Sequence, residues 1–221
     1  LEFRRVLFRS NIKLDTVDLP GLNEGKDEED LLPPVGGGLY GDYVRWGILP
    51  EDQVNGGSTT LLKLGLVYDT RDNEPNPMKG IWTDLQFHYA PSFLGNSGLT
   101  YARMVLNHRQ YFTIIPEIVN VAYRLSYQAK LGGDMPFYML PFVFNTPPRT
   151  TRDGLGGAKT IRGVLRNRVA GDDFFYGNLE LRWKFLRTVV FNQNLYLAIA
   201  GFADAGRITS NYELQTPEAE Y

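Results

Sequence analysis

The sequence predicts an all-β fold that forms part of a transmembrane antiparallel β-barrel. Apolar and polar residues alternate with period two over segments of about 11–15 residues, whereas soluble strands usually have five or six. Short connections alternate with longer ones along the chain, as in outer-membrane barrels. The polar side of the alternation carries Arg, Lys, Glu and Asp, which a dry sandwich core excludes and a water-filled lumen accepts.

Composition excludes several classes of protein. The 221 residues contain no cysteine, which excludes disulfide frameworks, thiolate metal sites and cysteine nucleophiles. A net charge of −2 argues against a nucleic-acid partner. No apolar run reaches the roughly 18–20 residues of a membrane helix. The mean hydropathy of −0.26 is compatible with a barrel, because every second strand residue faces a polar lumen.

The first ten residues are treated separately from the fold. Residues 1–10, Leu-Glu-Phe-Arg-Arg-Val-Leu-Phe-Arg-Ser, resemble the translation of a sequencing-library adapter. The alternative is a genuine basic amphipathic start, and we expect the adapter. We therefore predict an artefact over 1–10, a partial barrel over 11–208 and a truncated loop over 209–221. On this interpretation the chain is a fragment, and the lack of a signal peptide says nothing about location.

The regular strands are predicted from about residue 59 onward. They cover 59–69, 81–89, 99–113, 119–131, 175–185 and 195–204, after a weak alternation over 11–19. Turn-forming residues join neighbouring strands at 70–80, 95–98, 115–117 and 191–194. Residues 19–57 are expected to form an exposed loop, whose acidic run is more simply a solvated surface than a cation site. Residues 134–173 are a second, long loop.

Aromatic residues near the predicted strand ends would suit the interfacial girdles of a membrane barrel. They are Tyr68, Tyr89, Tyr111, Phe112, Phe174 and Phe191.

The long loop contains a glycine-rich stretch around a single arginine. Residues 154–163 read Gly-Leu-Gly-Gly-Ala-Lys-Thr-Ile-Arg-Gly, so the backbone can turn tightly while Arg162 is held out on a long stem. The stretch alone is equally compatible with an ordinary surface loop. A loop of this length is uncommon unless it is functional or disordered.

Several segments in order resemble the superfamily of BamA/TamA-like outer-membrane assembly and surface-antigen barrels. Thr160-Ile161-Arg162-Gly163 is similar to its Val-Arg-Gly-Phe signature, although Val164 stands where the family usually has Phe. The other matching segments are Gly65-Leu66-Val67-Tyr68-Asp69-Thr70-Arg71-Asp72, Pro77-Met78-Lys79-Gly80, Met135-Pro136-Phe137-Tyr138 and Gly201-Phe202-Ala203-Asp204-Ala205-Gly206.

The resemblance implies a sixteen-stranded barrel of which about six or seven later-middle strands are present. It also implies that the long loop folds inward and that periplasmic domains lie upstream. The implied role is insertion or translocation of polypeptides at the outer membrane of a Gram-negative bacterium, without enzymatic activity. The implied partners are outer-membrane lipid, nascent outer-membrane or secreted polypeptides, and periplasmic or lipoprotein accessory subunits.

The resemblance also assigns site residues. The functional loop motif is Gly156, Gly157, Thr160, Ile161, Arg162 and Gly163. The implied inner-wall partners of Arg162 are Glu180 and Asp204, which the alternation independently places on the polar, inward face. A guanidinium can bridge two carboxylates by paired, charge-assisted hydrogen bonds. In the alternative, Arg162 is solvated and both carboxylates merely line a channel.

Other chemistry is not indicated. The sequence has no GxSxG, HExxH or GxxxxGK[ST] motif, and no cofactor is expected. We expect no metal site: His88 and His108 are isolated, and turn capping accounts for Asp69, Asp72 and Asp84. A passive porin-like channel, the barrel domain of a fused lipase-like or two-partner-secretion protein, and a soluble β-sandwich remain as alternatives.

Overall fold

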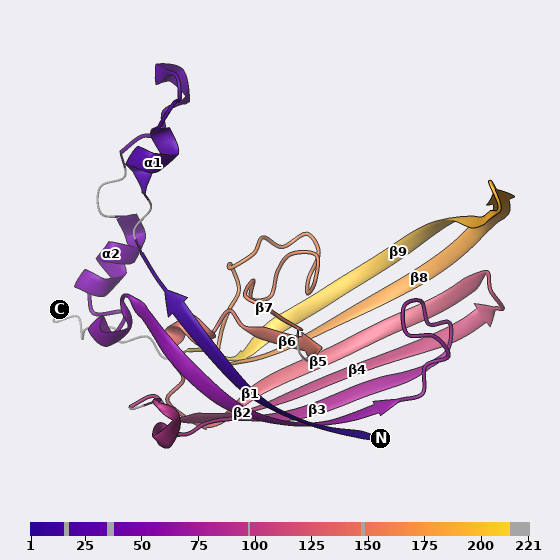
Figure 1. Ribbon diagram of the computed structural model, residues 1–221, viewed down its shortest axis with the longest axis horizontal. Helices are drawn as coiled ribbons and strands as arrows, with labels where there is room; N and C mark the ends of the chain where they lie inside the picture. Colours follow the sequence, from indigo (N-terminus) through magenta and orange to yellow (C-terminus); the bar gives the residue numbers. More distant parts are fainter. Residues whose placement is uncertain (16–17, 35–37, 97, 147–148, 213–221) are drawn as a thin grey trace. The chain divides into compact units, whose positions relative to one another are not determined.

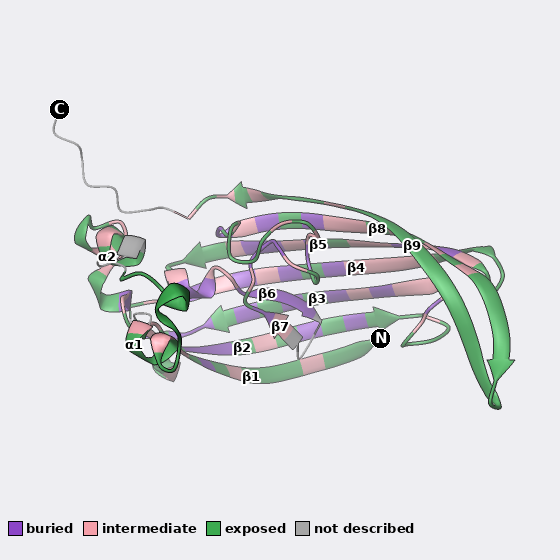
Figure 2. Cartoon of the chain, turned by 90° about the horizontal axis from the view of Figure 1, so that it is seen from above, coloured by how far each residue is buried: buried purple, intermediate pink, exposed green. Residues whose placement is uncertain are grey.

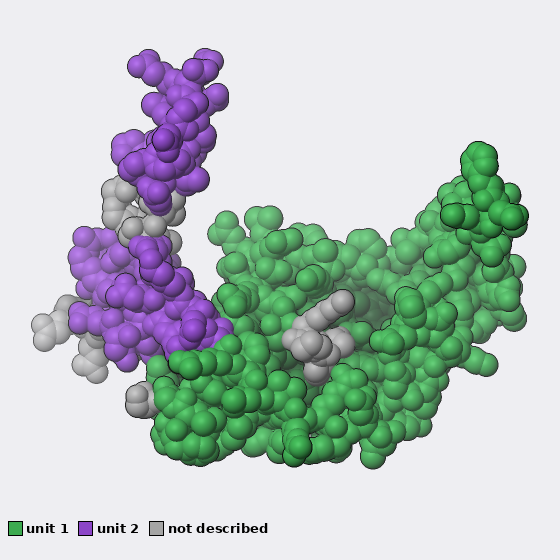
Figure 3. All heavy atoms as spheres, in the orientation of Figure 1, with its two compact units in different colours: residues 1–9, 59–212 green, residues 10–58, 213–221 purple. Residues whose placement is uncertain are grey.

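The computed structural model describes residues 1–15, 18–34, 38–96, 98–146 and 149–212. The chain divides into two compact units, one made of residues 1–9 and 59–212 and the other of residues 10–58 and 213–221. Figure 3 colours the two units separately. The seven-stranded sheet from residue 59 onward and the long loop, residues 134–172, belong to the first unit.

One antiparallel sheet carries most of the structure. Its seven strands lie in the order β1-β2-β3-β4-β5-β8-β9, so neighbours in the sheet are also successive along the chain apart from two short loop strands. The bounds are β1 Glu2–Lys13, β2 Gly56–Asp69, β3 Gly80–Ala90, β4 Tyr101–Ile115, β5 Val119–Gly133, β8 Asp173–Val190 and β9 Gln193–Ser210. The first unit's strands curl about a concave face (Figure 1). This all-β partial barrel confirms the predicted fold class.

The sheet has an inverted burial pattern, with apolar side chains outside and polar side chains inside. In β3, Leu85 and Phe87 are 42% and 41% exposed, whereas Asp84 and His88 are fully buried. The exposure map of Figure 2 shows this alternation along the strands. A soluble sheet would bury its apolar side, so the outward face is matched to lipid and the inward face to a polar lumen.

Two of the aromatic residues predicted for the interfacial girdles lie elsewhere. Phe174 is 1% exposed and packs in an inward cluster with Val143, Leu155 and Tyr176, and Tyr111 lines the inner cavity. Their places in the pleat turn both side chains inward, although both residues lie near strand ends. The exposed members are Tyr68, Tyr89, Phe112 and Phe191.

The connection at 70–79 is not a tight turn. It spans ten residues between β2 and β3, and its backbone reaches the inner face of the sheet. The Met78 carbonyl accepts a hydrogen bond from the Thr113 hydroxyl (3.0 Å), and the Pro77 carbonyl accepts one from the Asn120 amide (3.3 Å). Within this connection, the Asp72 carboxylate accepts a hydrogen bond from the Met78 backbone amide at 3.0 Å.

The long loop between β5 and β8 folds onto the concave face, as predicted, and contains structure that the sequence did not indicate. It includes the 3-10 turn η4 (Phe137–Met139) and a two-stranded ladder of β6 (Val143–Thr146) and β7 (Arg149–Thr151). Asn107 of β4 donates to the Phe144 carbonyl at 2.9 Å. The β6 segment therefore uses side chains of the barrel wall as hydrogen-bond partners.

Short helices replace much of the exposed loop expected over residues 19–57. The helices are α1 (Leu19–Asn23) and α2 (Gly38–Arg45), with 3-10 turns η1 (Glu28–Asp30) and η2 (Glu51–Gln53). Asp18 caps α1 by accepting from the Gly21 amide at 3.1 Å, and a proline lies in its first turn. No helix in the described part of the chain is long and apolar enough to cross a membrane.

The predicted part boundaries remain predictions. Residues 2–13 form strand β1 at one edge of the sheet, and their origin as an adapter is a separate question from their conformation. Strand β9 ends at Ser210, and residues 213–221 of the expected truncated loop lie outside the described residues.

An outward charge should distinguish a membrane barrel from a soluble sheet. We expect Leu85→Arg to lower the free energy of unfolding by about 2–4 kcal/mol in lipid vesicles, the cost of Arg on a lipid-facing strand near the midplane. Leu165→Arg in the long loop, where Leu165 is 70% exposed, should change it by less than about 0.5 kcal/mol. Denaturant titration in vesicles measures both. Equal, small effects would contradict the lipid-facing assignment.

Candidate functional site

The motif segment has a backbone that only glycine accommodates at two positions. Gly157 has a φ of +78°, in the left-handed region. A Cβ at Gly156 would clash with the carbonyl oxygen of Leu165, because the two arms of the loop approach closely there. The Gly157 amide donates to the Val164 carbonyl at 2.8 Å and closes this approach. The motif is therefore a folded hairpin-like turn.

The Thr160 side chain fastens the turn from within. It is 1% exposed, and its hydroxyl oxygen accepts from the Gly156 amide at 2.7 Å. The same hydroxyl lies 2.8 Å from the Gly156 carbonyl, to which it can donate. Ile161 packs beside the inward cluster, close to Gly206 of β9, where a Cβ would lie 2.7 Å from its Cδ1 atom. Gly163 follows with a φ of +89° and open space around it.

Arg162 reaches two carboxylates on the barrel wall. Its Nε and Nη2 atoms donate to the two oxygens of Asp204, each at 2.7 Å, and Nη1 donates to Glu180 at 2.7 Å. The Arg162 backbone amide also donates to Asp204, at 2.9 Å. The guanidinium lies 3.7 Å from the centroid of the Phe202 ring. One cation thus joins the loop to two adjacent strands, β8 and β9.

The two carboxylates have different surroundings. The Asp204 side chain is 2% exposed, and that of Glu180 is 22% exposed. Glu180 shares its second oxygen with Arg182, which donates from Nε at 2.9 Å and from Nη2 at 2.6 Å. Asp204 therefore pairs with one arginine, Arg162, whereas Glu180 bridges two arginines.

Arg162 keeps its charge in this environment. Its hydrogen bonds to Asp204, and then those to Glu180, raise the pKa of the guanidinium further above its already high ordinary value. The contact is therefore a permanent ionic tether that does not switch off within the physiological pH range.

Arg124 and Asn178 are functional candidates that sequence reasoning missed. Asn178 donates to Asp204 and to the Thr160 carbonyl, both at 2.7 Å. Arg124 donates to the Asn178 amide oxygen at 2.8 Å and to the Lys159 carbonyl at 2.7 Å. The alternation places both residues on the inward face, but no spacing in the sequence indicates that they hold the loop backbone. The alternation also places Phe202 on the face of Asp204, because it lies two residues earlier in the same strand.

A second group of wall residues holds the β6 part of the loop. Arg103 of β4 is 1% exposed and lies between the Phe144 and Phe174 rings, at 5.8 and 5.5 Å. Its guanidinium faces the carbonyl of Phe142, just before β6, and the carbonyl of Asp172, just before β8, each at 3.5 Å. Tyr176 hydrogen-bonds Asn145. The loop is thus attached to the wall around β6, at its motif and at its end.

The contacts of this site hold a loop segment in place. Among the described residues, no group of three His, Asp or Glu side chains is arranged to bind a metal ion. His88 lies 2.9 Å from Gln86, and His108 lies 2.8 Å from Thr83. Of the three aspartates near the first turn, Asp69 forms an ion pair with Arg71 at 2.7 Å.

Removing the Thr160 hydroxyl should loosen the motif. We expect Thr160→Val, which keeps the shape and leaves the Gly156 amide unsatisfied, to destabilise the closed loop by about 1–3 kcal/mol. Thr160→Ser keeps the hydroxyl and should cost much less. Hydrogen exchange of the Gly156 and Gly157 amides measures the change. Equal protection in the valine and serine variants would contradict this role of the hydroxyl.

Comparison with known proteins places this geometry in a family. No curated protein matches the chain. The model of the Omp85 superfamily domain matches residues 40–220, which cover β2 to β9, the inward loop and the Arg162 site. The matched region is well over half of the chain, and its lipid-facing antiparallel sheet is the architecture that the sequence predicted. The chain belongs to the Omp85 superfamily.

Proposed function

We propose that this protein is part of an outer-membrane β-barrel that inserts polypeptides into the outer membrane or translocates them across it. Membership of the Omp85 superfamily supports a role in outer-membrane protein insertion or secretion. The observation that carries the proposal is the loop fixed inside the curled sheet by Arg162, Glu180 and Asp204. A passive porin-like channel would show the same strand alternation but should lack this arginine motif and its two carboxylate partners.

The tethered loop would act as a positioning element, without catalysis. By joining β8 to β9 through one guanidinium, it would stiffen the wall on which these strands lie. A flexible seam elsewhere in the barrel would then expose unpaired backbone groups, which can template an incoming strand. Unpaired backbone is costly in hydrocarbon, so the seam would open only transiently.

Partners follow from the same proposal. The outward faces of the strands would contact outer-membrane lipid of a Gram-negative cell, and the clients would be nascent outer-membrane or secreted polypeptides. Periplasmic or lipoprotein accessory subunits would assist. A two-partner-secretion role and a barrel fused to a lipase-like domain remain alternatives, and the upstream sequence of the gene would separate them.

Reconstitution tests the proposal against the passive-channel alternative. The protein in liposomes should accelerate the folding of a urea-denatured outer-membrane barrel client, measured as the heat-modifiable band on gels. Alternatively, it should move a secreted client into the interior of the liposome. Matched liposomes loaded with a small fluorescent solute measure passive efflux. Rapid efflux without any effect on clients would favour the porin-like channel and contradict the proposal.

A further inference from the structure

A hydrogen-bonded cluster of polar side chains crosses three strands on the lipid-facing side of the sheet. Its members, the outer polar cluster, are Thr83 of β3, His108 and Gln110 of β4, and Tyr123 of β5. The Thr83 hydroxyl lies 2.8 Å from Nδ1 of His108, and Nε2 of His108 lies 3.3 Å from the Tyr123 hydroxyl. The Tyr123 hydroxyl donates to Oε1 of Gln110 at 2.6 Å.

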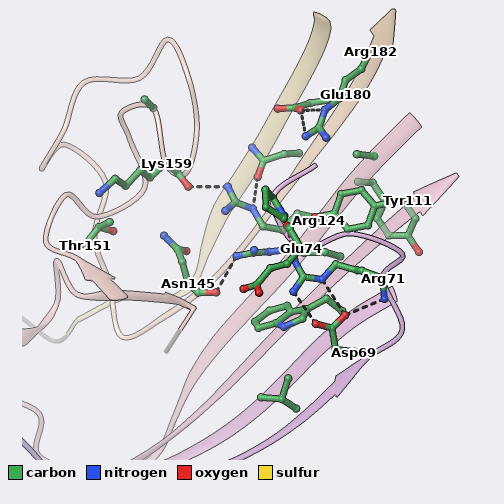
Figure 4. Close-up of a pocket in the computed structure, with 18 of the residues that line it drawn as sticks. Asp69, Arg71, Glu74, Tyr111, Arg124, Asn145, Thr151, Lys159, Glu180 and Arg182 are labelled. Atoms are coloured by element: carbon green, nitrogen blue, oxygen red, sulfur yellow. Dashed lines mark hydrogen bonds and ion pairs between the residues drawn. The ribbon is translucent and has the colours of Figure 1, made fainter. Parts of the chain in front are cut away.

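The register of the strands places this cluster on the outward face. Thr83 is the register partner of His108, and Gln110 is that of Tyr123. Partners in a ladder share one face of the sheet, and successive residues of a strand alternate between the two faces. Arg124, the residue after Tyr123, points to the opposite side and lines the inner cavity between the loop and the barrel wall (Figure 4).

The contacts of the Tyr123 side chain agree with this placement. Tyr123 borders the inner cavity together with its neighbours in the strand, but its hydroxyl reaches His108 and Gln110. Its ring stacks on Phe112, with the ring centroids 6.1 Å apart and an interplanar angle of 25°. Phe112 is an exposed residue of the outward face. The Tyr123 side chain is therefore part of the lipid-facing surface.

Exposed aromatic residues show the depth of the cluster in the membrane. Tyr68 lies next to the last residue of β2, Phe112 lies near the end of β4, and Trp183 lies opposite the first residue of β5. Such residues at one end of the strands mark the membrane interface. Tyr68 is the register partner of Thr83, and Phe112 follows Gln110 by two residues. The cluster therefore lies just inside the aromatic girdle, at the depth of the lipid ester groups.

The order of donors and acceptors leaves one end of the cluster open. The Tyr123 hydroxyl gives its single hydrogen to Gln110, so its oxygen accepts from the Nε2–H group of His108. In a neutral imidazole, Nδ1 then accepts from the Thr83 hydroxyl. The open end is the Gln110 amide nitrogen, which carries two N–H donors. Among the described residues, this nitrogen has no hydrogen-bond partner.

The open end calls for a ligand that offers acceptor atoms. An amide N–H group that faces hydrocarbon is unfavourable unless it finds an acceptor. Just inside the interface of a bilayer, the acceptors are the carbonyl oxygens of the lipid esters, because the phosphates lie further out. The bond from Tyr123 holds the Gln110 amide by its oxygen, so the nitrogen is already oriented when the acceptor arrives.

We propose that the outer polar cluster binds the glycerol-ester carbonyls of a phospholipid, with Gln110 as the donor and Tyr123 as the positioning residue. One lipid would then be held beside β4 and β5, and its contact would fix the depth of these strands in the bilayer. The inference goes beyond the proposed function, because it concerns the outward face of the barrel and no client polypeptide.

Competition between two lipids that differ only in their carbonyl groups tests the inference. The protein in detergent is mixed with equal amounts of a diester phosphatidylethanolamine and its diether analogue, with the same head group and chain length. Native mass spectrometry then counts the lipid that each protein retains. We expect the diester lipid to be retained about tenfold more, as two neutral hydrogen bonds would give. Gln110→Leu should abolish this preference.

Two further variants make the test specific. The matched control Gln193→Leu changes an exposed glutamine at the start of β9 and should keep the preference of the parent. Tyr123→Phe removes the hydroxyl that orients the amide and should give an intermediate preference. Equal retention of both lipids by the parent, an unchanged preference in Gln110→Leu, or an equal loss in Gln193→Leu would overturn the inference. A parent dimer that shows no ester preference and that Gln110→Leu dissociates would assign the cluster to a protein contact and also overturn it.

Discussion

Arg162→Ala is expected to release the inward loop and to abolish most of the protein's activity toward clients. Breaking a fully buried ion pair costs about 3–5 kcal/mol. The cost here should be smaller, because the Arg162 side chain is 26% exposed. We therefore expect about 2–3 kcal/mol in favour of the open loop, which is roughly a 30- to 150-fold rise in the open population. The stacking over Phe202 is lost as well.

Trypsin cleavage after Arg166 measures this opening. The Arg166 side chain is 69% exposed, but a protease needs the surrounding backbone to unfold locally. Cleavage should accelerate in Arg162→Ala and accelerate less in Arg162→Lys, which keeps one charge and loses the fork. The matched control is Arg187→Ala, which removes a surface pair with Glu117 where both side chains are more than half exposed. Unchanged cleavage and full activity in both Arg162 variants would refute the tether.

The barrel strands could be predicted because lipid imposes a simple rule on them. Every second residue must be apolar, and the connecting turns need special residues, so period two identifies β2 to β5, β8 and β9 without tertiary information. The same rule fails at Phe174, where the loop supplies an apolar partner on the inner face. It fails also at 70–79, where composition indicates a turn and says nothing about hydrogen bonds to Thr113 and Asn120.

The site was only partly accessible from sequence. Alternation gives the face of Glu180 and Asp204, and the structure describes both side chains on that face. The pairing with Arg162 came from the resemblance, because 18 and 42 residues separate the partners and no local pattern spans such distances. The contacts of Arg124 and Asn178 with the loop could not be predicted, for a related reason. They bind backbone carbonyls of the loop, and a carbonyl has no sequence signature.

The two acidic partners of Arg162 should differ strongly when each is neutralised. Asp204 accepts two hydrogen bonds from the Arg162 guanidinium, one from the Arg162 backbone amide and one from the Asn178 side chain. Asp204→Asn replaces one of these acceptor oxygens by an NH2 donor that faces other donors. We expect a cost of about 2–4 kcal/mol for closing the loop, because the site is buried. Glu180→Gln loses one contact with Arg162 at a more exposed position and should cost about 1 kcal/mol or less. Cleavage after Arg166 ranks both variants.

A double-mutant cycle decides whether Arg162 and Asp204 act as one unit. If they do, adding Asp204→Asn to Arg162→Ala should open the loop little more than Arg162→Ala alone, which gives a coupling energy of about 2 kcal/mol. The residual effect would report the Asn178 contact, which survives the loss of the guanidinium. The cycle between Arg162 and Glu117, whose side chain pairs with Arg187 elsewhere on the sheet, should give additive effects. Additivity at Asp204 as well would mean that the two side chains stabilise the closed loop independently, which would contradict the ionic tether.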